Sequence, residues 1–178
     1  MNEEKNHGFQ KLWAPWRMKY IDNIDTGDEA GCIFCAKPGE GDDEKNFILH
    51  RAITCFVIMN IYPYNNGHVM VVPYRHTPSF RDLDSETRLE IMDLIDIIFE
   101  AISSVMRPDG FNVGINLGRT AGAGIQDHIH VHIVPRWNGD TNFMPVIGCA
   151  KVISESLEDT YAKLKKALRD TGAKGQRD

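Results

Sequence analysis

The sequence predicts an α+β fold in which an antiparallel sheet of about five strands packs against one long helix and a C-terminal helix. Two observations lead to this prediction: short β-rich segments follow one another with brief turns, and only two stretches have helical periodicity. The 178 residues, 42% of them hydrophobic, are enough for one core. We therefore expect one central domain over residues 31–140, an N-terminal extension over 1–30 that packs on it, and a C-terminal extension over 141–178 that contains a helix.

The predicted strands are rich in β-branched and aromatic residues and are separated by turn-forming residues. The stretch "KPGEGDDEK" (37–45) precedes them and has the Pro, Gly and charge content of a loop. Turn chemistry in "YPYNNG" (62–67) separates the second strand from the third. The five expected strands are "NFILHR" (46–51), "CFVIMN" (55–60), "HVMVVPYRH" (68–76), "FNVGINLG" (111–118) and "HIHVHIV" (128–134).

Two stretches have the spacing of amphipathic helices. The first covers about residues 84–106, with Asp84 or Ser85 as a suitable N-cap, and the second covers residues 154–170. The residues expected on the buried faces are Leu89, Met92, Ile95, Phe99, Ile102 and Met106 in the first helix, and Leu157, Tyr161, Leu164 and Leu168 in the second.

The charge balance limits the kinds of partner that the chain can attract. The net charge is −5 and the pI is about 5.8, so we expect no broad attraction to nucleic acid or to an anionic membrane. No apolar run reaches the roughly 20 residues that a membrane span needs, and the start of the chain is polar rather than signal-like. These features predict a cytoplasmic protein, whose four cysteines would serve as thiols or metal ligands rather than as disulfides.

The most specific chemical feature of the sequence is "HIHVHIVPRW", residues 128–137. Side chains alternate between the two faces of a strand, so His128, His130 and His132 would share one face while aliphatic residues occupy the other. A solvated polar face could contain one histidine by chance, but three in alternation indicate chemistry.

Two kinds of chemistry suit these histidines. Three imidazoles could bind zinc, but on one extended strand they spread over roughly 13 Å, so all three cannot easily converge on one ion. Alternatively, the middle imidazole could act as a nucleophile toward phosphorus, with its other nitrogen held by an acceptor. The Gly-rich stretch "AGAG" (121–124) just upstream could then offer backbone N–H groups to phosphate oxygens, although such a stretch can equally be a turn.

The triad "HIHVHIV" resembles the His-x-His-x-His motif of the histidine-triad (HIT) family of nucleotide hydrolases and transferases. The resemblance covers roughly residues 30–140 and further motifs follow in the family's order, namely "CIFC", "NGHVMVVPYRH", "NLG" and "VPRW". The segments "LWAPWRMKYI" and "PRWNGDTNF" resemble the branch related to diadenosine tetraphosphate phosphorylases and ATP adenylyltransferases. The resemblance therefore implies a HIT-like fold and, as is usual in the family, a homodimer.

The resemblance also implies roles for individual residues. His130 would attack the α-phosphorus of a nucleotide and form a nucleotidyl-histidine intermediate. His132 would contact the phosphate or position the central ring, and His68 would support the site from the neighbouring strand. These three residues are the expected catalytic group.

Four further residues match nucleotide-binding positions of the family. Asn60 would bind the ribose hydroxyls, although its place before Pro63 also suits a turn. Asn116, Gly122 and Gly124 would contact phosphate. The loop "AGAGIQD" departs from the Gly-Gln-Ser or Gly-Gln-Thr of many members, which favours the phosphorylase-like branch, and His132 in place of the Gln of galactose-1-phosphate uridylyltransferase relatives argues against sugar-phosphate transfer.

A second site is suggested by the Cys-x-x-Cys pair, which by itself suits either redox chemistry or a metal. Some bacterial members of the family bind a structural zinc at such a pair together with two histidines. The resemblance implies a closed set of ligands at Cys32, Cys35, His76 and His128, with His50 as a competing ligand. The other two cysteines, at positions 55 and 149, are interpreted as small buried hydrophobic residues.

The predicted function is nucleotidyl transfer on adenine dinucleoside polyphosphates, with phosphorolysis of diadenosine tetraphosphate as the first choice. One alternative is a hydrolase of dinucleoside polyphosphates or nucleoside phosphoramidates. A second alternative is a nucleotide-binding regulator without significant turnover. The choice between water and orthophosphate as acceptor could depend on Arg136, Asn138 and Asp140 after the triad.

Overall fold

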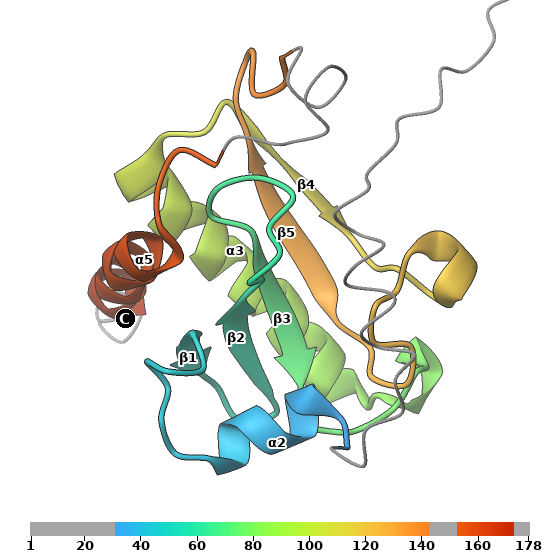
Figure 1. Ribbon diagram of the computed structural model, residues 1–178. Coiled ribbons are helices and arrows are strands. Elements are labelled where there is room, and N and C mark those ends of the chain that lie inside the picture. The colour runs from blue at the N-terminus through green and yellow to red at the C-terminus, as the bar shows by residue number, and fades with distance from the viewer. Residues whose placement is uncertain (1–30, 143–152, 173–178) are drawn as a thin grey trace, which may run out of the picture.

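The fold is α+β, as the sequence predicts. The computed structural model describes residues 31–142 and 153–172. Within them, five strands form one antiparallel sheet in the order β1-β2-β3-β5-β4 (Figure 1). The strands are β1 (Ile48–Arg51), β2 (Cys55–Met59), β3 (Val69–Pro73), β4 (Gly110–Gly114) and β5 (Val131–Arg136).

Three α-helices surround this sheet within the described residues. The short helix α2 (Ile33–Gly39) lies at one end of β1–β3, the long helix α3 (Ser85–Met106) crosses one face of the sheet, and α5 (Leu157–Gly172) packs against α3 and β1 (Figure 1). Two short 3₁₀ turns complete the fold, η1 (Phe80–Asp82) and η2 (Arg119–Ala121). The face of the sheet opposite α3 carries the candidate functional site.

The sheet is buried on both faces at its centre. All five residues of β2 are buried, and they alternate between two clusters. Cys55, Val57 and Met59 pack with α3 and α5, whereas Phe56 and Ile58 pack with Phe34 of α2 on the other face. This explains why β2 is a continuous apolar run rather than an alternating one.

The long helix α3 confirms the expected element but corrects its buried face. Asp84 is the N-cap, and its Oδ1 accepts the backbone N–H of Thr87 at 2.8 Å. Leu89 and Met92, which the periodicity assigned to the core, are 63% and 59% exposed. The buried stripe lies one position around the helix, at Ile91, Leu94, Ile95, Ile98, Ala101 and Ile102. Both stripes are apolar and share two residues, so spacing alone could not separate them.

The helix α2 was not expected from the sequence. Lys37, Pro38 and Gly39 form its end, so residues 37–39 do not belong to the loop predicted over 37–45. With seven residues, no side-chain cap and a proline near its end, this helix has too little local signal to be recognised. Only Phe34 of this helix is buried, and contacts with the rest of the fold must therefore stabilise it.

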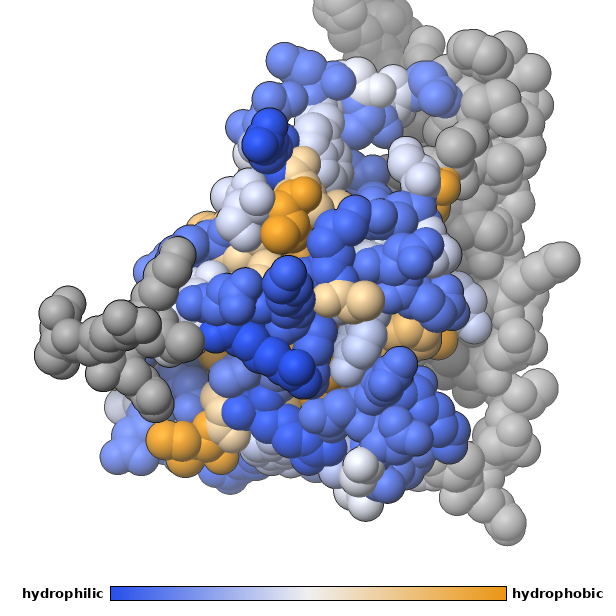
Figure 2. Space-filling view, turned by 90° about the vertical axis from the view of Figure 1, so that its left-hand side faces the viewer, coloured by the Kyte–Doolittle hydropathy of each residue, from blue (hydrophilic) through white to orange (hydrophobic). Residues whose placement is uncertain are grey.

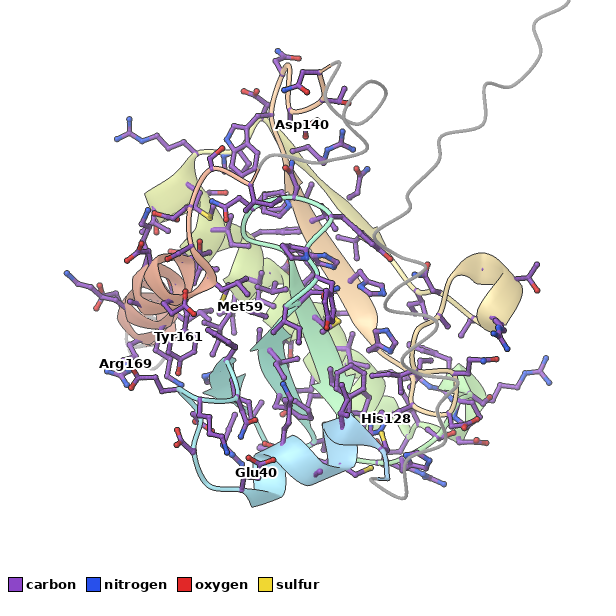
Figure 3. All side chains as sticks on the ribbon, viewed as in Figure 1. Glu40, Met59, His128, Asp140, Tyr161 and Arg169 are labelled. Atoms are coloured by element: carbon purple, nitrogen blue, oxygen red, sulfur yellow. The ribbon has the colours of Figure 1, made fainter. Side chains whose placement is uncertain are left out.

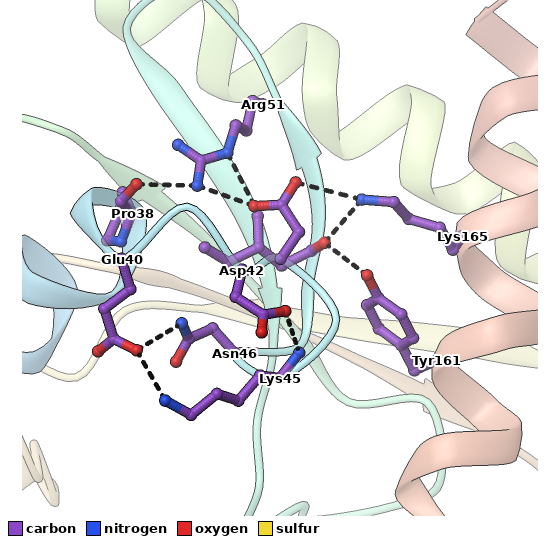
Figure 4. Close-up of polar contacts among 10 residues, drawn as sticks. Pro38, Glu40, Asp42, Lys45, Asn46, Arg51, Tyr161 and Lys165 are labelled. Atoms are coloured by element: carbon purple, nitrogen blue, oxygen red, sulfur yellow. Dashed lines mark hydrogen bonds and ion pairs between the residues drawn. The ribbon is translucent and has the colours of Figure 1, made fainter.

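The helix α5 is amphipathic as expected, with Tyr161, Leu164 and Leu168 buried. Figure 2 shows this side of the molecule, where hydrophilic side chains cover most of the surface. A polar network ties the helix to β1 (Figure 4): the Tyr161 hydroxyl and the Lys165 ammonium both donate to the carbonyl of Ile48, at 3.2 and 2.8 Å. Lys165 also lies 3.5 Å from Asp43, which in turn pairs with Arg51.

Some expectations concern residues outside the described ones. The extension over residues 1–30, Cys149 and the segment 173–178 fall there, and the division into a domain and two extensions stays a prediction. None of the helices within 31–142 and 153–172 is long and apolar enough to cross a membrane.

Candidate active site and metal site

The three alternating histidines lie at the start of β5, on the face opposite α3. Sheet pairing with β3 begins at Val131, and His128 and His130 stand just before it. The backbone N–H of Ile129 donates to the carbonyl of Thr77 at 2.7 Å, which keeps this lead-in segment extended. The intervening aliphatic side chains, Ile129, Val131 and Ile133, belong to the main core. Burying them requires the histidines to face the other way.

His130 is held by one hydrogen bond that determines its tautomer. Its Nδ1 lies 2.8 Å from the carbonyl of His128, and because a carbonyl only accepts, Nδ1 carries the proton. The lone pair is therefore on Nε2. The side chain is 5% exposed, and burial lowers the pKa of His130, an effect that this hydrogen bond partly offsets. A neutral imidazole with a free Nε2 is the form that a nucleophile needs.

His132 is oriented by a chain of hydrogen bonds that begins at a backbone group. The N–H of Tyr64 donates to Nδ1 of His68 at 3.1 Å, so the proton of His68 is on Nε2. That Nε2 lies 3.0 Å from Nδ1 of His132, which must then accept. In its neutral form His132 therefore carries its proton on Nε2 and presents a donor. The register that pairs His132 with Met70 of β3 brings it onto the same face as His68.

Asn116 lies beside this chain of imidazoles. Its amide nitrogen is 3.4 Å from both the Tyr64 hydroxyl and Nε2 of His132. Nε2 of His132 is a donor, so it needs an acceptor rather than the amide nitrogen. A 180° flip of the Asn116 side-chain amide, which exchanges its nitrogen and oxygen, would place the oxygen opposite both groups. The amide is thus linked to His132 and Tyr64 rather than isolated in the loop after β4.

A cavity opens directly above His130 and His132. It is lined by Asn60, Gly122 and Gly124, which the sequence assigned to nucleotide binding, and by apolar side chains from α2, β2 and β3. Asn60 also serves the turn that was the alternative interpretation, because its Oδ1 accepts the N–H of Tyr62 at 2.9 Å. The structure thus brings three of the four predicted nucleotide residues to the predicted nucleophile, whereas Asn116 does not line this cavity and reaches it through His132 and Tyr64.

Several lining residues were missed by sequence reasoning. Phe34 and Lys37 come from the unexpected helix α2, and Tyr64 comes from the loop that was interpreted only as a turn. Tyr64 stacks on His68, with ring centroids 4.7 Å apart. The "CIFC" motif was the one signal in the sequence that could have indicated Phe34. If both cysteines bind a metal, the position of a residue between them is constrained.

A second cluster, formed by Cys32, Cys35, His76 and His128, lies next to the triad. Their ligand atoms all lie within 4.8 Å of one another. His128 Nδ1 is 3.2 Å from Cys32 Sγ, 3.5 Å from Cys35 Sγ and 3.3 Å from His76 Nδ1, and Cys35 Sγ is 3.4 Å from His76 Nδ1. Tetrahedral zinc with the usual bond lengths separates its ligands by about 3.3–3.8 Å. The cluster therefore fits a closed four-ligand metal site.

The protonation of the cluster also suits a cation. Nε2 of His128 donates to the carbonyl of Pro73 at 2.8 Å, which leaves Nδ1 with its lone pair toward the cysteines. Burial and the adjacent Cys32 thiol raise the pKa of Cys35, so a pair of thiolates here requires a positive charge between them. His50, the competing ligand, is not a member of the cluster.

The cluster and the triad share a structural link through α2. Phe34 stands between the two cysteines and is 2% exposed. Its ring contacts His128 and His130, with centroid separations of 5.5 and 5.0 Å. In Figure 3, His128 lies beside the start of α2. Phe34 therefore contacts both the cysteine–histidine cluster, through His128, and the cavity, through His130.

The residues after the triad form a polar network at the end of β5. Arg136 donates to both carboxylate oxygens of Asp140 and to the amide oxygen of Asn112 on β4. Asp140 also accepts from Asn65 at 2.9 Å. Neither Arg136, Asn138 nor Asp140 is among the lining residues of the cavity. Within the described chain, Arg136 and Asp140 brace the end of β5, and an influence of these residues on the acceptor stays a prediction.

The fold and the alternating buried histidines define a histidine-triad protein. The HIT domain family model matches residues 42–139, more than half of the chain, and the protein therefore belongs to the HIT family.

Relatives within the family have named activities. Over 156 residues, the chain is 41% identical to an AP-4-A phosphorylase of Mycobacterium tuberculosis, with 85% of this chain and 80% of the relative covered. It is 33% identical over 107 residues to an adenosine 5'-monophosphoramidase of Schizosaccharomyces pombe, with 60% and 75% covered. A zinc-bound histidine triad family protein from Mycobacterium smegmatis has a similar structure, with a TM-score of 0.65, 27% identity, and 81% of this chain and 97% of that chain covered.

Proposed function

We propose that the protein is an enzyme that transfers a nucleotidyl group from adenine dinucleoside polyphosphates to orthophosphate through a histidine intermediate. With diadenosine tetraphosphate the products would be ATP and ADP. The observation that carries this proposal is the buried His130, whose Nδ1–H is bound to the His128 carbonyl and whose Nε2 is free. The similarity to the AP-4-A phosphorylase supports the choice of substrate.

The reaction divides one displacement at phosphorus into two. In the first step Nε2 of His130 forms a bond to the α-phosphorus, the bridging P–O bond breaks, and ATP leaves with the electron pair. In the second step an oxygen of orthophosphate attacks the same phosphorus, the P–N bond breaks, and ADP forms as His130 recovers its lone pair. The fixed Nδ1–H bond stabilises the positive charge that the ring gains in the intermediate.

The surrounding residues suit the substrate's other groups. His132 can donate its Nε2–H to a phosphate oxygen in place of Asn116, and the backbone N–H of Gly124 can do the same. The N–H of Gly122 already donates to the carbonyl of Arg119 at 2.9 Å. His68 holds His132 in the donating tautomer and is a positioning residue. Asn60 can bind the ribose hydroxyls with the amide hydrogens that its turn contact leaves unused.

Hydrolysis is the second candidate, because the same adenylyl-histidine can be resolved by water. The similarity to an adenosine 5'-monophosphoramidase supports it. In that case the diadenosine tetraphosphate would yield ATP and AMP, and nucleoside phosphoramidates would also be cleaved.

The acceptor is identified by product analysis with labelled phosphate. The enzyme is incubated with diadenosine tetraphosphate and ¹⁸O-labelled orthophosphate, and the products are analysed by mass. Phosphorolysis predicts ATP without label and ADP that carries labelled oxygen. Unlabelled AMP with ATP, formed at a rate independent of phosphate, would establish hydrolysis instead.

We further propose that the cluster of two cysteines and two histidines binds zinc. The ligand separations and the available lone pair on Nδ1 of His128 support this identity, as does the zinc-bound relative. When bound, the ion would supply charge neutralisation and a rigid anchor, because four protein ligands leave no position for a reacting water. Metal analysis of the purified protein should give about one zinc per chain, and Cys32→Ser should lower it sharply. A zinc-free wild type, prepared without chelators, would contradict the proposal.

We propose a homodimer as the assembly. The outer edge of β4, which pairs with no strand of the described residues, and the exposed Val113 on it offer one surface that a second copy could cover. The exposed Leu89 and Met92 on α3 offer another. Sedimentation equilibrium should give twice the chain mass of 20.2 kDa. The cytoplasmic location and the absence of nucleic-acid partners stay predictions from the sequence.

A further inference from the structure

Lys37 places a positive charge in the wall of the cavity above His130. Among the described residues that line this cavity, it is the only lysine, arginine or carboxylate. The side chain is half-buried, and no hydrogen bond or ion pair joins its ammonium to a described residue. The Glu40 carboxylate attracts this ammonium through space, but its hydrogen bonds go to Asn46 at 3.0 Å and to Lys45 at 3.4 Å.

The position of Lys37 relates it to the base rather than to the phosphates. The helix α2 presents Ile33, Phe34 and Lys37 to the cavity, and Ile58 and Met70 of the sheet extend the same apolar wall. A flat aromatic base is the part of a nucleotide that such a wall accepts. The donors suited to phosphate, the glycine-rich segment and His132, lie on other elements.

We propose that Lys37 is a specificity-determining residue that donates a hydrogen bond to an acceptor atom on the base of the bound nucleotide. The inference rests on the proposed function, since it takes the cavity to be a nucleotide site. A purine ring offers acceptor nitrogens at its edges, and an ammonium in an apolar wall discriminates strongly because a base without a matching acceptor leaves the charge unpaired. The residue would thus select which base enters.

Binding measurements on the full-length protein separate a base contact from a phosphate contact. AMP and adenosine are titrated calorimetrically into the wild type, Lys37→Met and the control Lys166→Met, whose exposed ammonium lines a different cavity. A base contact predicts that Lys37→Met weakens AMP and adenosine equally, by about 10-fold, because the lost bond involves a charged donor. The control should bind both ligands as the wild type does.

A second measurement does not depend on the variant. The wild type is titrated with 1-deaza-, 3-deaza- and 7-deaza-AMP, each of which lacks one ring acceptor of adenine. One analogue should bind about 10-fold more weakly than AMP. The affinity for this same analogue should not fall further in Lys37→Met, because the hydrogen bond is already absent.

Three results would overturn the proposal. A loss for AMP with none for adenosine would assign Lys37 to phosphate. Unchanged binding of both ligands in a folded Lys37→Met would show that Lys37 does not contact the nucleotide. Its role would then be limited to the favourable interaction of a positive charge with the last turn of a helix. Equal affinity of all three deaza analogues and AMP would exclude a ring acceptor. Failure of the wild type to bind either AMP or adenosine would instead contradict the proposed function.

Discussion

His130 illustrates how one backbone hydrogen bond sets the chemistry of a side chain. Burial lowers its pKa and keeps the ring neutral, and the His128 carbonyl assigns the single proton to Nδ1. Neither effect needs a second ionisable side chain. Both depend on the extended backbone around residues 128–130, which the bond from Ile129 to Thr77 maintains.

Replacement of His130 by alanine is expected to abolish turnover while leaving nucleotide binding largely intact. The variant lacks the attacking nitrogen but keeps the cavity walls, so kcat should fall by at least about 1000-fold. Turnover of diadenosine tetraphosphate and AMP affinity are the two measurements, with His50→Ala as a control histidine outside the cluster and the cavity.

The same experiment tests the regulator alternative. A pure binding protein would show no turnover in the wild type. Mass spectrometry of wild type quenched during turnover should place the adenylyl adduct on His130, and an adduct on any other histidine would refute the assignment.

At the scale of elements, α2 depends on contacts outside itself. It is short, has no side-chain cap and buries one residue, yet it supplies part of the cavity wall. Its two cysteines anchor it to His76 and His128 in the candidate metal cluster. Metal binding and nucleotide binding should therefore be thermodynamically linked.

Removal of the metal is expected to weaken nucleotide binding by roughly 5-fold or more, because the wall formed by α2 loses its anchor. AMP affinity is measured calorimetrically before and after chelation and after metal is restored. Linkage requires that AMP raises the affinity for metal by the same factor, which a chelator competition measures. Identical AMP affinities with and without metal would show that the cluster and the cavity are independent.

Another link between elements joins α3 to the turn between β1 and β2. The Glu90 carboxylate accepts the backbone N–H groups of Ile53 and Thr54, at 2.9 and 2.7 Å, and the Thr54 hydroxyl at 2.6 Å. Burial by itself would raise the pKa of Glu90, but these hydrogen bonds lower it below its ordinary value. The charged form is therefore favoured by the fold.

The stability contributed by Glu90 should depend on pH in a defined direction. Because the folded-state pKa is depressed, the contribution is complete above the unfolded pKa of about 4.3 and is lost as the pH falls through the folded value. Glu90→Gln should lower the free energy of unfolding by about 1–2 kcal/mol at pH 7.

The difference in unfolding free energy between Glu90→Gln and the wild type should shrink below about pH 4. Urea unfolding across this range measures it, with Glu100→Gln on the exposed side of α3 as the control. A difference that is constant with pH would show that the carboxylate charge is not involved.

At the scale of the whole molecule, the two faces of the sheet have separate tasks. The core between the sheet, α3 and α5 contains most of the buried aliphatic side chains, whereas the smaller cluster around Phe34 and Phe56 supports the cavity. The polar network at Asp43, Tyr161 and Lys165 closes the main core at β1 (Figure 4). Stability and binding can therefore be perturbed separately.

A pair of leucines tests this arrangement. Leu164→Ala removes a side chain that is 1% exposed at the contact of α5 with the core, so it should cost about 2–5 kcal/mol of unfolding free energy without changing AMP affinity. Leu89→Ala, at an exposed site on α3, should cost less than about 0.5 kcal/mol in the monomer. Urea unfolding measures both. Equal costs for the two variants would contradict the buried face that we assign to α3.

Sequence alone determined the features that depend on local periodicity and composition. The five strands, the long helix, the C-terminal helix and the alternation of His128, His130 and His132 follow from patterns of period 2 and 3.6. These patterns are local because they reflect which side of one element is covered by apolar neighbours.

Tertiary structure decided what no local pattern contains. It selected between two apolar stripes on α3, formed α2 through packing of Phe34, and brought Cys32 within 3.2 Å of His128, 96 residues away in the chain. It also brought Lys37 into the wall of the cavity that His130 and His132 line. The physical reason is that each of these outcomes depends on the free energy of contacts between distant segments, which only the completed sheet brings together.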